Sequence, residues 1–141
     1  MEEIKGFVGE YEFLSNFSKS PILWNDMTYP TVEHAFQASK TKDIEEKRRI
    51  CALPTPGKAK REGRNIRLRP DWESMKLDVM LALVRRKFEI PSLHQKLLET
   101  GDAYLEETNN WGDKFWGVDG TGENQLGKIL MQIRDEIRNE E

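Results

Sequence analysis

The sequence has few of the residues that build a disulfide, a structural metal site or a membrane anchor. Cys51 is the only cysteine, and the two histidines, His34 and His94, lie far apart in the sequence. One cysteine excludes a disulfide within these residues and a zinc site made of several cysteines. No stretch of about 18 apolar residues occurs, and no basic segment followed by an apolar run opens the chain. We therefore expect a cytoplasmic protein with no signal peptide, no membrane partner, no metal and no other cofactor.

An excess of charge of one sign is also missing. Lys and Arg total 22 and Asp and Glu total 25, which gives a formal charge of -3 at pH 7. A general basic field for holding nucleic acid is therefore absent, and a substrate phosphate must meet a local basic cluster. No repeat or low-complexity linker interrupts the 141 residues, whose number suits one domain. We expect residues 1–141 to form a single domain.

Helix signals outnumber strand signals along the chain. Asp43 and Thr55 are in positions typical of helix N-caps, as is Ser92, whereas Gly63 and Gly101 are placed as helix terminators. We predict a hairpin over 21–29, helices over 31–42, 43–53, 55–63, 71–88, 92–100 and 124–137, and short strands near 4–7 and 104–106. The expected fold class is mainly α, a single compact helical domain with a few short β-strands.

One predicted helix face collects three polar side chains. Glu33, Gln37 and Lys40 are spaced i, i+4 and i+7, so they share one face of the helix predicted over 31–42. A carboxylate, an amide and an ammonium in one stripe are suited to line a pocket. The alternative is an ordinary solvated face, because the helix dipole alone favours a glutamate in the first turn.

His34 stands next to this stripe but lacks partners in the sequence. A single histidine without a second ligand nearby is typical of a hydrogen-bonded structural residue. We therefore predict a structural role for it.

A second candidate region is basic and ends in a tryptophan. Arginine provides a fork for phosphate oxygens, lysine a point charge, and Trp72 a face on which a base stacks. The alternative is an exposed helix surface. The cations of this cluster are Lys58, Lys60, Arg61, Arg64, Arg67 and Arg69.

The third candidate region is the loop over residues 109–124. It contains Trp111 and Trp116, several glycines and many Asn and Asp side chains, but few aliphatic residues. Such a loop is suited to stack a base and to hydrogen-bond ribose hydroxyls. The helix predicted from Asn124 also offers backbone N–H groups to an anion. The alternative is a structural loop held by its own tryptophans.

Motifs spread over nearly the whole chain resemble the NADAR family. They are FLSNF at 13–17, YPTVEHAFQASK at 29–40, residues 56–64, 71–72, 87–88 and 98–102, and WGVDGTGENQLG at 116–127 with Leu130, Met131 and Arg134. The family is mainly helical. Its members resemble enzymes that cleave N-glycosidic bonds, some in phosphorylated riboflavin-pathway intermediates and others between ADP-ribose and guanine in DNA.

The resemblance implies roles for particular positions. Glu33 would be the essential carboxylate, with Lys40 and Asp119 as the other catalytic residues. From the resemblance and the residue patterns above, the expected substrate-binding residues are Asn16, Phe17, Gln37, Lys60, Arg64, Trp72, Trp111, Trp116 and Asn124. The expected substrate is a phosphorylated nucleotide-like or ADP-ribosyl compound, with ADP-ribosylated DNA among the alternatives.

Cleavage of a base–ribose bond sets the chemical demands on such a site. Positive charge develops at the anomeric carbon and negative charge on the departing base. Glu33 would stabilise that cation or activate water. Alternatively Lys40, with Lys60 as the second candidate amine, would attack the sugar and form a Schiff base if burial lowers its pKa. The competing class of function is a non-catalytic module that binds ADP-ribose or a related nucleotide through the same groups.

Overall fold

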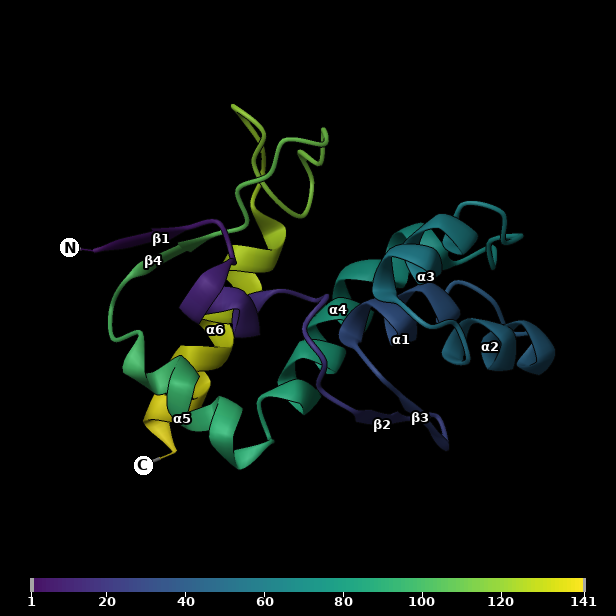
Figure 1. Cartoon of the computed structure of the whole chain (residues 1–141), viewed down its shortest axis with the longest axis horizontal. Coiled ribbons are helices and arrows are strands. Elements are labelled where there is room, and N and C mark those ends of the chain that lie inside the picture. Colours follow the sequence, from purple (N-terminus) through teal and green to yellow (C-terminus); the bar gives the residue numbers. More distant parts are fainter. Residues whose placement is uncertain (1, 141) are drawn as a thin grey trace. The chain divides into compact units, whose positions relative to one another are not determined.

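The computed structural model describes residues 2–140 and divides the chain into two compact units (Figure 1). The central unit comprises residues 16–87, and the terminal unit combines residues 2–15 with residues 88–140. Helices provide most of the regular structure in both, which confirms the mainly helical class with a few short strands. That residues 1–141 form one domain stays a prediction. Within residues 2–140, no helix is both long and apolar enough to cross a membrane.

The central unit begins with the predicted hairpin. Strands β2 (Ile22–Trp24) and β3 (Met27–Tyr29) pair in antiparallel fashion, with Ile22 opposite Tyr29. Asn25 and Asp26 connect them, and both have positive φ, 49° and 65°. Two such residues form the type I′ turn whose twist matches that of paired strands. The hairpin leads directly into the first helix.

Helix α1 (Val32–Ala38) is shorter than the predicted 31–42. Thr31 caps it by accepting a hydrogen bond of 3.1 Å from the His34 N–H. At the other end the Ser39 hydroxyl donates to the Ala35 carbonyl at 2.7 Å, and the Lys40 carbonyl accepts from the Arg69 N–H at 2.8 Å. The backbone hydrogen bonds change from i−4 at Ser39 to i−3 at Lys40 and Thr41, which ends the α-helix. Lys40 therefore lies beyond α1.

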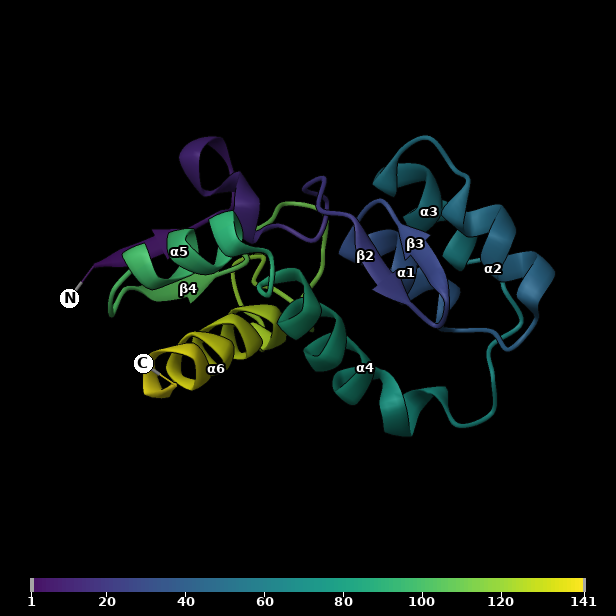
Figure 2. The ribbon, with the colours of Figure 1, turned by 90° about the horizontal axis from the view of Figure 1, so that it is seen from below.

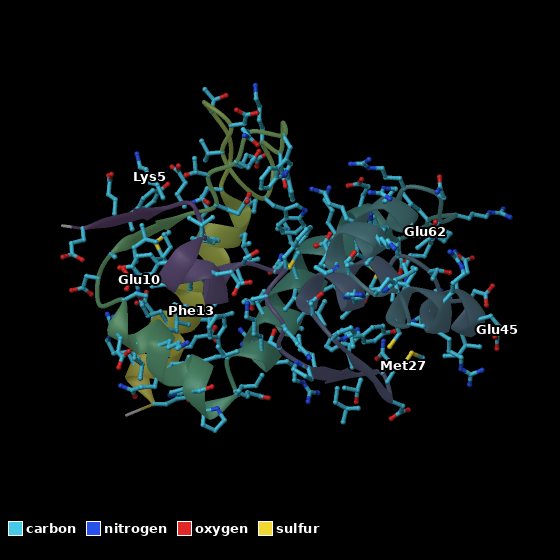
Figure 3. All side chains as sticks on the ribbon, in the orientation of Figure 1. Lys5, Glu10, Phe13, Met27, Glu45 and Glu62 are labelled. Carbon is cyan, nitrogen blue, oxygen red and sulfur yellow. The ribbon has the colours of Figure 1, made fainter. Side chains whose placement is uncertain are left out.

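The next two helices follow their predicted caps. Asp43 accepts from the Glu45 N–H before α2 (Ile44–Cys51), and Thr55 accepts from the Lys58 N–H before α3 (Pro56–Gly63). An ion pair joins Arg49 of α2 to Glu62 of α3, and Figure 3 labels Glu62 and Glu45 on these helices. Proline as the first residue of α3 needs no N–H partner there.

Helix α4 (Trp72–Lys87) completes the central unit and confirms the prediction over 71–88. Its apolar side chains Val79, Met80 and Leu83 are buried. Helix α1 packs against α3, α4 and the hairpin, and Figure 2 shows it beside β2, β3 and α3. The core of this unit is therefore built around α1.

The terminal unit joins the two ends of the chain. Strand β1 (Glu3–Lys5) pairs in parallel with β4 (Tyr104–Glu106), and a 3-10 helix, η1 (Gly9–Leu14), follows β1. The sequence did not predict η1. Helices α5 (Pro91–Glu99) and α6 (Gln125–Asn139) pack together around buried Leu97 and Leu130. The predicted Ser92 cap of α5 is wrong, because Pro91 already lies inside the helix and Ile90 occupies the N-cap.

Candidate active site

Helix α1 buries polar side chains together with its apolar ones. All seven of its residues are buried, and Glu33 and Gln37 are only 8% and 5% exposed. The solvated-face alternative for these two residues is therefore wrong. Burying a carboxylate costs free energy unless hydrogen bonds and charges compensate for the lost water. Such costly groups are concentrated at functional sites, so α1 is the first place to look for one.

Hydrogen bonds to both its backbone and its carboxylate hold Glu33 in place. The Gln37 side-chain amide donates to Glu33 Oε1 at 2.9 Å, as i, i+4 spacing on a helix allows. The Glu33 N–H donates to the Asn16 carbonyl at 3.2 Å, and the Asn16 side-chain amide contacts Met80 Sδ at 3.5 Å. Asn16 therefore contacts the backbone of Glu33 and the core of α4. Both the backbone and the carboxylate of Glu33 are fixed.

Lys40 lies close enough to Glu33 for their charges to interact. Burial lowers the pKa of Lys40, the Glu33 carboxylate raises it, and the positive charges of Arg64 and Lys76 lower it further. The net effect is a pKa below the ordinary lysine value. The ammonium also lies 6.0 Å from the centre of the Phe36 ring. A lysine whose pKa is lowered by burial thus lies within reach of the charge of a buried carboxylate.

Two residues of this neighbourhood were missed by the sequence analysis. Lys76 of α4 acts on the pKa of Lys40, and Phe36 contacts both Lys40 and Trp72. Lys76 lies one helical turn after Trp72, and that i, i+4 spacing was the available signal. Phe36 gave no signal beyond that of a core aromatic.

The residues of the predicted basic cluster do not all lie near the α1 site. Arg64 acts on Lys40, and Lys60 lies one turn earlier on α3. Arg67 and Arg69 instead line a separate groove of about 410 Å³, whose walls also contain acidic Asp43 and Glu46. Arg69 is further committed to Asp71, at 2.7 Å. Only part of the predicted phosphate cluster therefore accompanies the α1 site.

The aromatic residues predicted for this site differ in accessibility. Trp72 is 4% exposed, and its ring packs against Phe36 with the two centres 5.1 Å apart. Phe17 is exposed. In this structure Phe17 presents more surface for stacking than Trp72 does.

His34 has the structural role that its isolation in the sequence predicts. Its Nε2 lies 3.0 Å from the Leu53 carbonyl, which can only accept, so this nitrogen bears the proton. Nδ1 therefore accepts from the Thr31 hydroxyl at 2.8 Å. Burial lowers the pKa of His34, while the bond to Leu53 opposes this effect. Nowhere in residues 2–140 do three or more His, Cys, Asp or Glu side chains gather as a metal site would require.

The predicted loop over 109–124 belongs to the terminal unit and is held by its own polar side chains. The Asn109 side chain donates to the Asp113 carbonyl and accepts from the Trp111 and Asp113 N–H groups. Asp113 in turn accepts from the Phe115 and Trp116 N–H groups. The alternative interpretation is a loop held by its tryptophans. The bonds above show that asparagine and aspartate side chains order these turns.

The remaining predicted residues all lie in this loop or at its end. Trp111 is 60% exposed, Trp116 is half-buried, and Asp119 accepts from the Gly112 N–H at 2.9 Å. Asn124 is buried, and its side chain bonds to the Leu105 carbonyl and the Glu107 N–H. Trp111 is thus the residue with the most surface to offer a ligand.

The anion site predicted at the start of α6 is wrong for its first two N–H groups. Gln125 donates to the Phe115 carbonyl at 3.1 Å, and Leu126 donates to the Trp116 carbonyl at 2.9 Å. These groups are the donors that a phosphate would need. Carbonyl groups of the loop before the helix already accept hydrogen bonds from them.

Comparisons with known proteins agree with this picture. The family model described as NADAR domain matches residues 6–138. N-glycosidase YbiA of Shigella flexneri is 42% identical over 135 residues, covering 91% of this chain and 82% of that protein. Riboflavin biosynthesis protein VVA0006 of Vibrio vulnificus is 37% identical over 132 residues, covering 89% of this chain but 35% of that protein. The NMR structure of the E. coli protein YbiA has a TM-score of 0.88 and 37% identity, covering 99% of this chain and 86% of that chain. The chain therefore belongs to the NADAR family and is a glycosidase.

Proposed function

We propose that the α1 site hydrolyses the N-glycosidic bond between a base, either an aminopyrimidine or a nucleobase, and a phosphorylated ribose. The observation that supports this most is the buried Glu33 carboxylate beside Lys40, whose pKa burial lowers. An anion fixed in a water-poor place suits a reaction that builds positive charge on a sugar carbon.

In the direct route, Glu33 accepts a proton from water as the water oxygen bonds to the anomeric carbon. The bond from that carbon to the base nitrogen breaks, and the nitrogen takes its electron pair and a proton from solvent. General base action of this kind contributes roughly 10²- to 10⁴-fold in rate. The free base and ribose phosphate are the products.

In the covalent route, the neutral Lys40 amine attacks the anomeric carbon, and the base leaves with a proton. The sugar ring then opens to give an imine between Lys40 and the ribose carbon, which water hydrolyses to release the sugar. Glu33 stabilises the cationic states along this path. The lowered pKa of Lys40 favours this route, because only the neutral amine is nucleophilic.

The substrate we favour is a phosphorylated ribosylamino intermediate of the riboflavin pathway. The name of the relative VVA0006 supports this class, although this chain spans about a third of that protein. Arg64 and Lys76 supply positive charge near Lys40 for a phosphate, although Lys76 also pairs with Glu73 at 2.7 Å. Lys60 lies one turn before Arg64 on α3. ADP-ribosylated guanine is the competing substrate, since it presents the same sugar–base bond and also bears phosphates.

The residues of the loop over 109–124 keep their predicted roles in this proposal. Trp111 would stack on a base through its exposed ring, Trp116 and Asn124 would contact the substrate, and Asp119 would assist catalysis. Phe17 and Asn16 would contact the substrate next to Glu33.

A side-by-side assay tests the proposed substrate. The purified protein receives the phosphorylated ribosylaminopyrimidine and, separately, DNA containing ADP-ribosylated guanine, and mass spectrometry follows the released sugar. We expect release of ribose phosphate from the first compound. Release from the DNA alone would contradict the favoured substrate. Calorimetric binding of either compound without any product would instead identify a non-catalytic binding module.

A further inference from the structure

One glycine of α3 is required for a reason other than backbone conformation. The sequence predicts Gly63 as a helix terminator, but it is the last residue of α3, and Arg64 occupies the C-cap with ordinary right-handed angles. Gly63 does not have positive φ. A left-handed turn therefore does not explain it.

Close approach to Gln37 explains the glycine. A Cβ atom added to Gly63 would lie 1.8 Å from Gln37 Oε1 and 2.6 Å from Gln37 Cδ. Such distances are far below van der Waals contact, so any larger residue at position 63 must displace the Gln37 amide. Gly63 is itself buried, and the atom nearest to the added Cβ is the end of the Gln37 side chain, so the Gln37 amide is the group that moves.

The orientation of the Gln37 amide matters for Glu33. Its nitrogen donates to the Glu33 carboxylate at 2.9 Å, while its oxygen is buried against α3 with no hydrogen-bond partner among the described residues. An unsatisfied buried oxygen costs free energy, and turning the amide over would place that oxygen against the carboxylate. The amide is therefore held with its N–H toward Glu33, at a cost in stability.

We infer that Gln37 and Gly63 are positioning residues for the Glu33 carboxylate, rather than substrate contacts or a helix stop. Gly63 leaves the space that the Gln37 amide fills, and the amide fixes one oxygen of the Glu33 carboxylate. This inference rests on the proposed function of Glu33. It changes the predicted role of Gln37 from binding substrate to orienting the catalytic group.

A double-mutant cycle tests the inference, with release of sugar from the phosphorylated ribosylaminopyrimidine and from ADP-ribosylated DNA as the activity. We expect Gly63→Ala and Gln37→Ala each to lower kcat by about 10- to 100-fold with little change in KM, because a misplacement of about 1 Å costs up to 10²-fold. Combining them should lower kcat no further than Gln37→Ala alone, since the clash needs the glutamine side chain. The acid limb of the pH–rate profile should also move to higher pH when the amide donor is lost.

Gly57→Ala is the matched control within the same helix. A Cβ at Gly57 would approach only Thr55 Oγ1, at an ordinary 3.9 Å, so kcat should stay unchanged. If Gly63→Ala unfolds the protein, Gln37→Met, which keeps the length of the side chain but removes the donor, still must lower kcat and move the acid limb.

The outcomes separate this inference from the proposed function. If the losses of kcat in Gly63→Ala and Gln37→Ala multiply in the double variant, the positioning role is wrong. A wild-type pH–rate profile in Gln37→Met would also overturn it. In both cases an inactive Glu33→Gln would leave the proposed function standing. A rise in KM without a fall in kcat would also overturn it, because that result marks a substrate contact. Full activity of Glu33→Gln would overturn the proposed function, and this inference with it.

Discussion

Glu33, His34 and Gln37 are polar residues of one buried helix, yet they do different things. His34 uses both ring nitrogens within the fold, at 2.8 and 3.0 Å. Gln37 turns toward Glu33, and Glu33 is the side chain on which the proposed chemistry depends. Spacing along the helix indicated that Glu33 and Gln37 share a face. It did not indicate that the face is buried, since burial depends on the packing of α3 and α4 around α1.

The pH dependence of stability should reveal His34. Burial lowers its pKa in the folded protein, so on acidification the unfolded chain takes up a proton that the folded chain resists. The contribution to stability is complete above the unfolded value, about 6.5. It is lost as the pH falls below that value, by up to about 1.4 kcal/mol per pH unit. Urea unfolding between pH 5 and 8 should show a smaller loss in His34→Gln than in the wild type.

The half-buried His94 of the terminal unit provides the comparison for His34. His94→Gln, on α5, should lose stability on acidification as the wild type does. Identical pH profiles for His34→Gln and the wild type would refute the assignment.

Borohydride distinguishes the two routes at Lys40. Added during turnover, it reduces an imine to a stable amine, and we expect a sugar adduct on Lys40, which peptide mass spectrometry would locate. Lys40→Arg should give no adduct, because its guanidinium keeps its charge. Lys60→Arg should still be labelled. An active enzyme without any adduct, or an adduct on Lys60, would count against the covalent route through Lys40.

At the scale of the elements, caps and turns were the most predictable features. Asp43 and Thr55 cap α2 and α3 as expected, and the hairpin turns at Asn25 and Asp26. These signals are local, since a cap or turn depends on a few neighbouring residues. The early end of α1 was not predictable in this way, because residues 39–42 contain no glycine or proline to mark the change to i−3 hydrogen bonds at Lys40.

The hairpin turn tests directly whether a few neighbouring residues determine a turn. Asp26 has φ of 65°, where glycine is less strained, so Asp26→Gly should raise the free energy of unfolding by about 0.5–1 kcal/mol. Asn25→Ala should lower it by about 1 kcal/mol, because alanine tolerates positive φ poorly. Denaturant unfolding measures both. A loss of stability in Asp26→Gly would show that the Asp26 side chain supports the turn.

The loop over 109–124 and the start of α6 show the limit of local signals. The sequence indicated a loop with stacking tryptophans and a free helix end, yet the carbonyls of Phe115 and Trp116 occupy the first two α6 donors. Only the folded loop brings those carbonyls to the helix. The composition of the loop predicted its existence but not its internal bonds.

At the scale of the whole molecule, an acidic chain holds a locally cationic site. The formal charge is -3, but Arg64 and Lys76 both act on Lys40. Local charge of this kind suits one phosphorylated small molecule better than a long nucleic acid, whose binding depends on many phosphate contacts. The family and the glycosidase class were predictable because their motifs are spread over the sequence. The Gly63 contact was not, because it joins two helices that only the fold brings together.

Glu33→Gln is the most direct test of the proposed function. Glutamine keeps the shape of the side chain, and its oxygen still accepts from the Gln37 amide, so the unfolding temperature should change by only a few degrees. Single-turnover release of ribose phosphate from the phosphorylated ribosylaminopyrimidine should fall by at least about 100-fold, as expected when a catalytic carboxylate loses its charge. A folded Glu33→Gln protein that releases the sugar at nearly the wild-type rate would contradict the central claim.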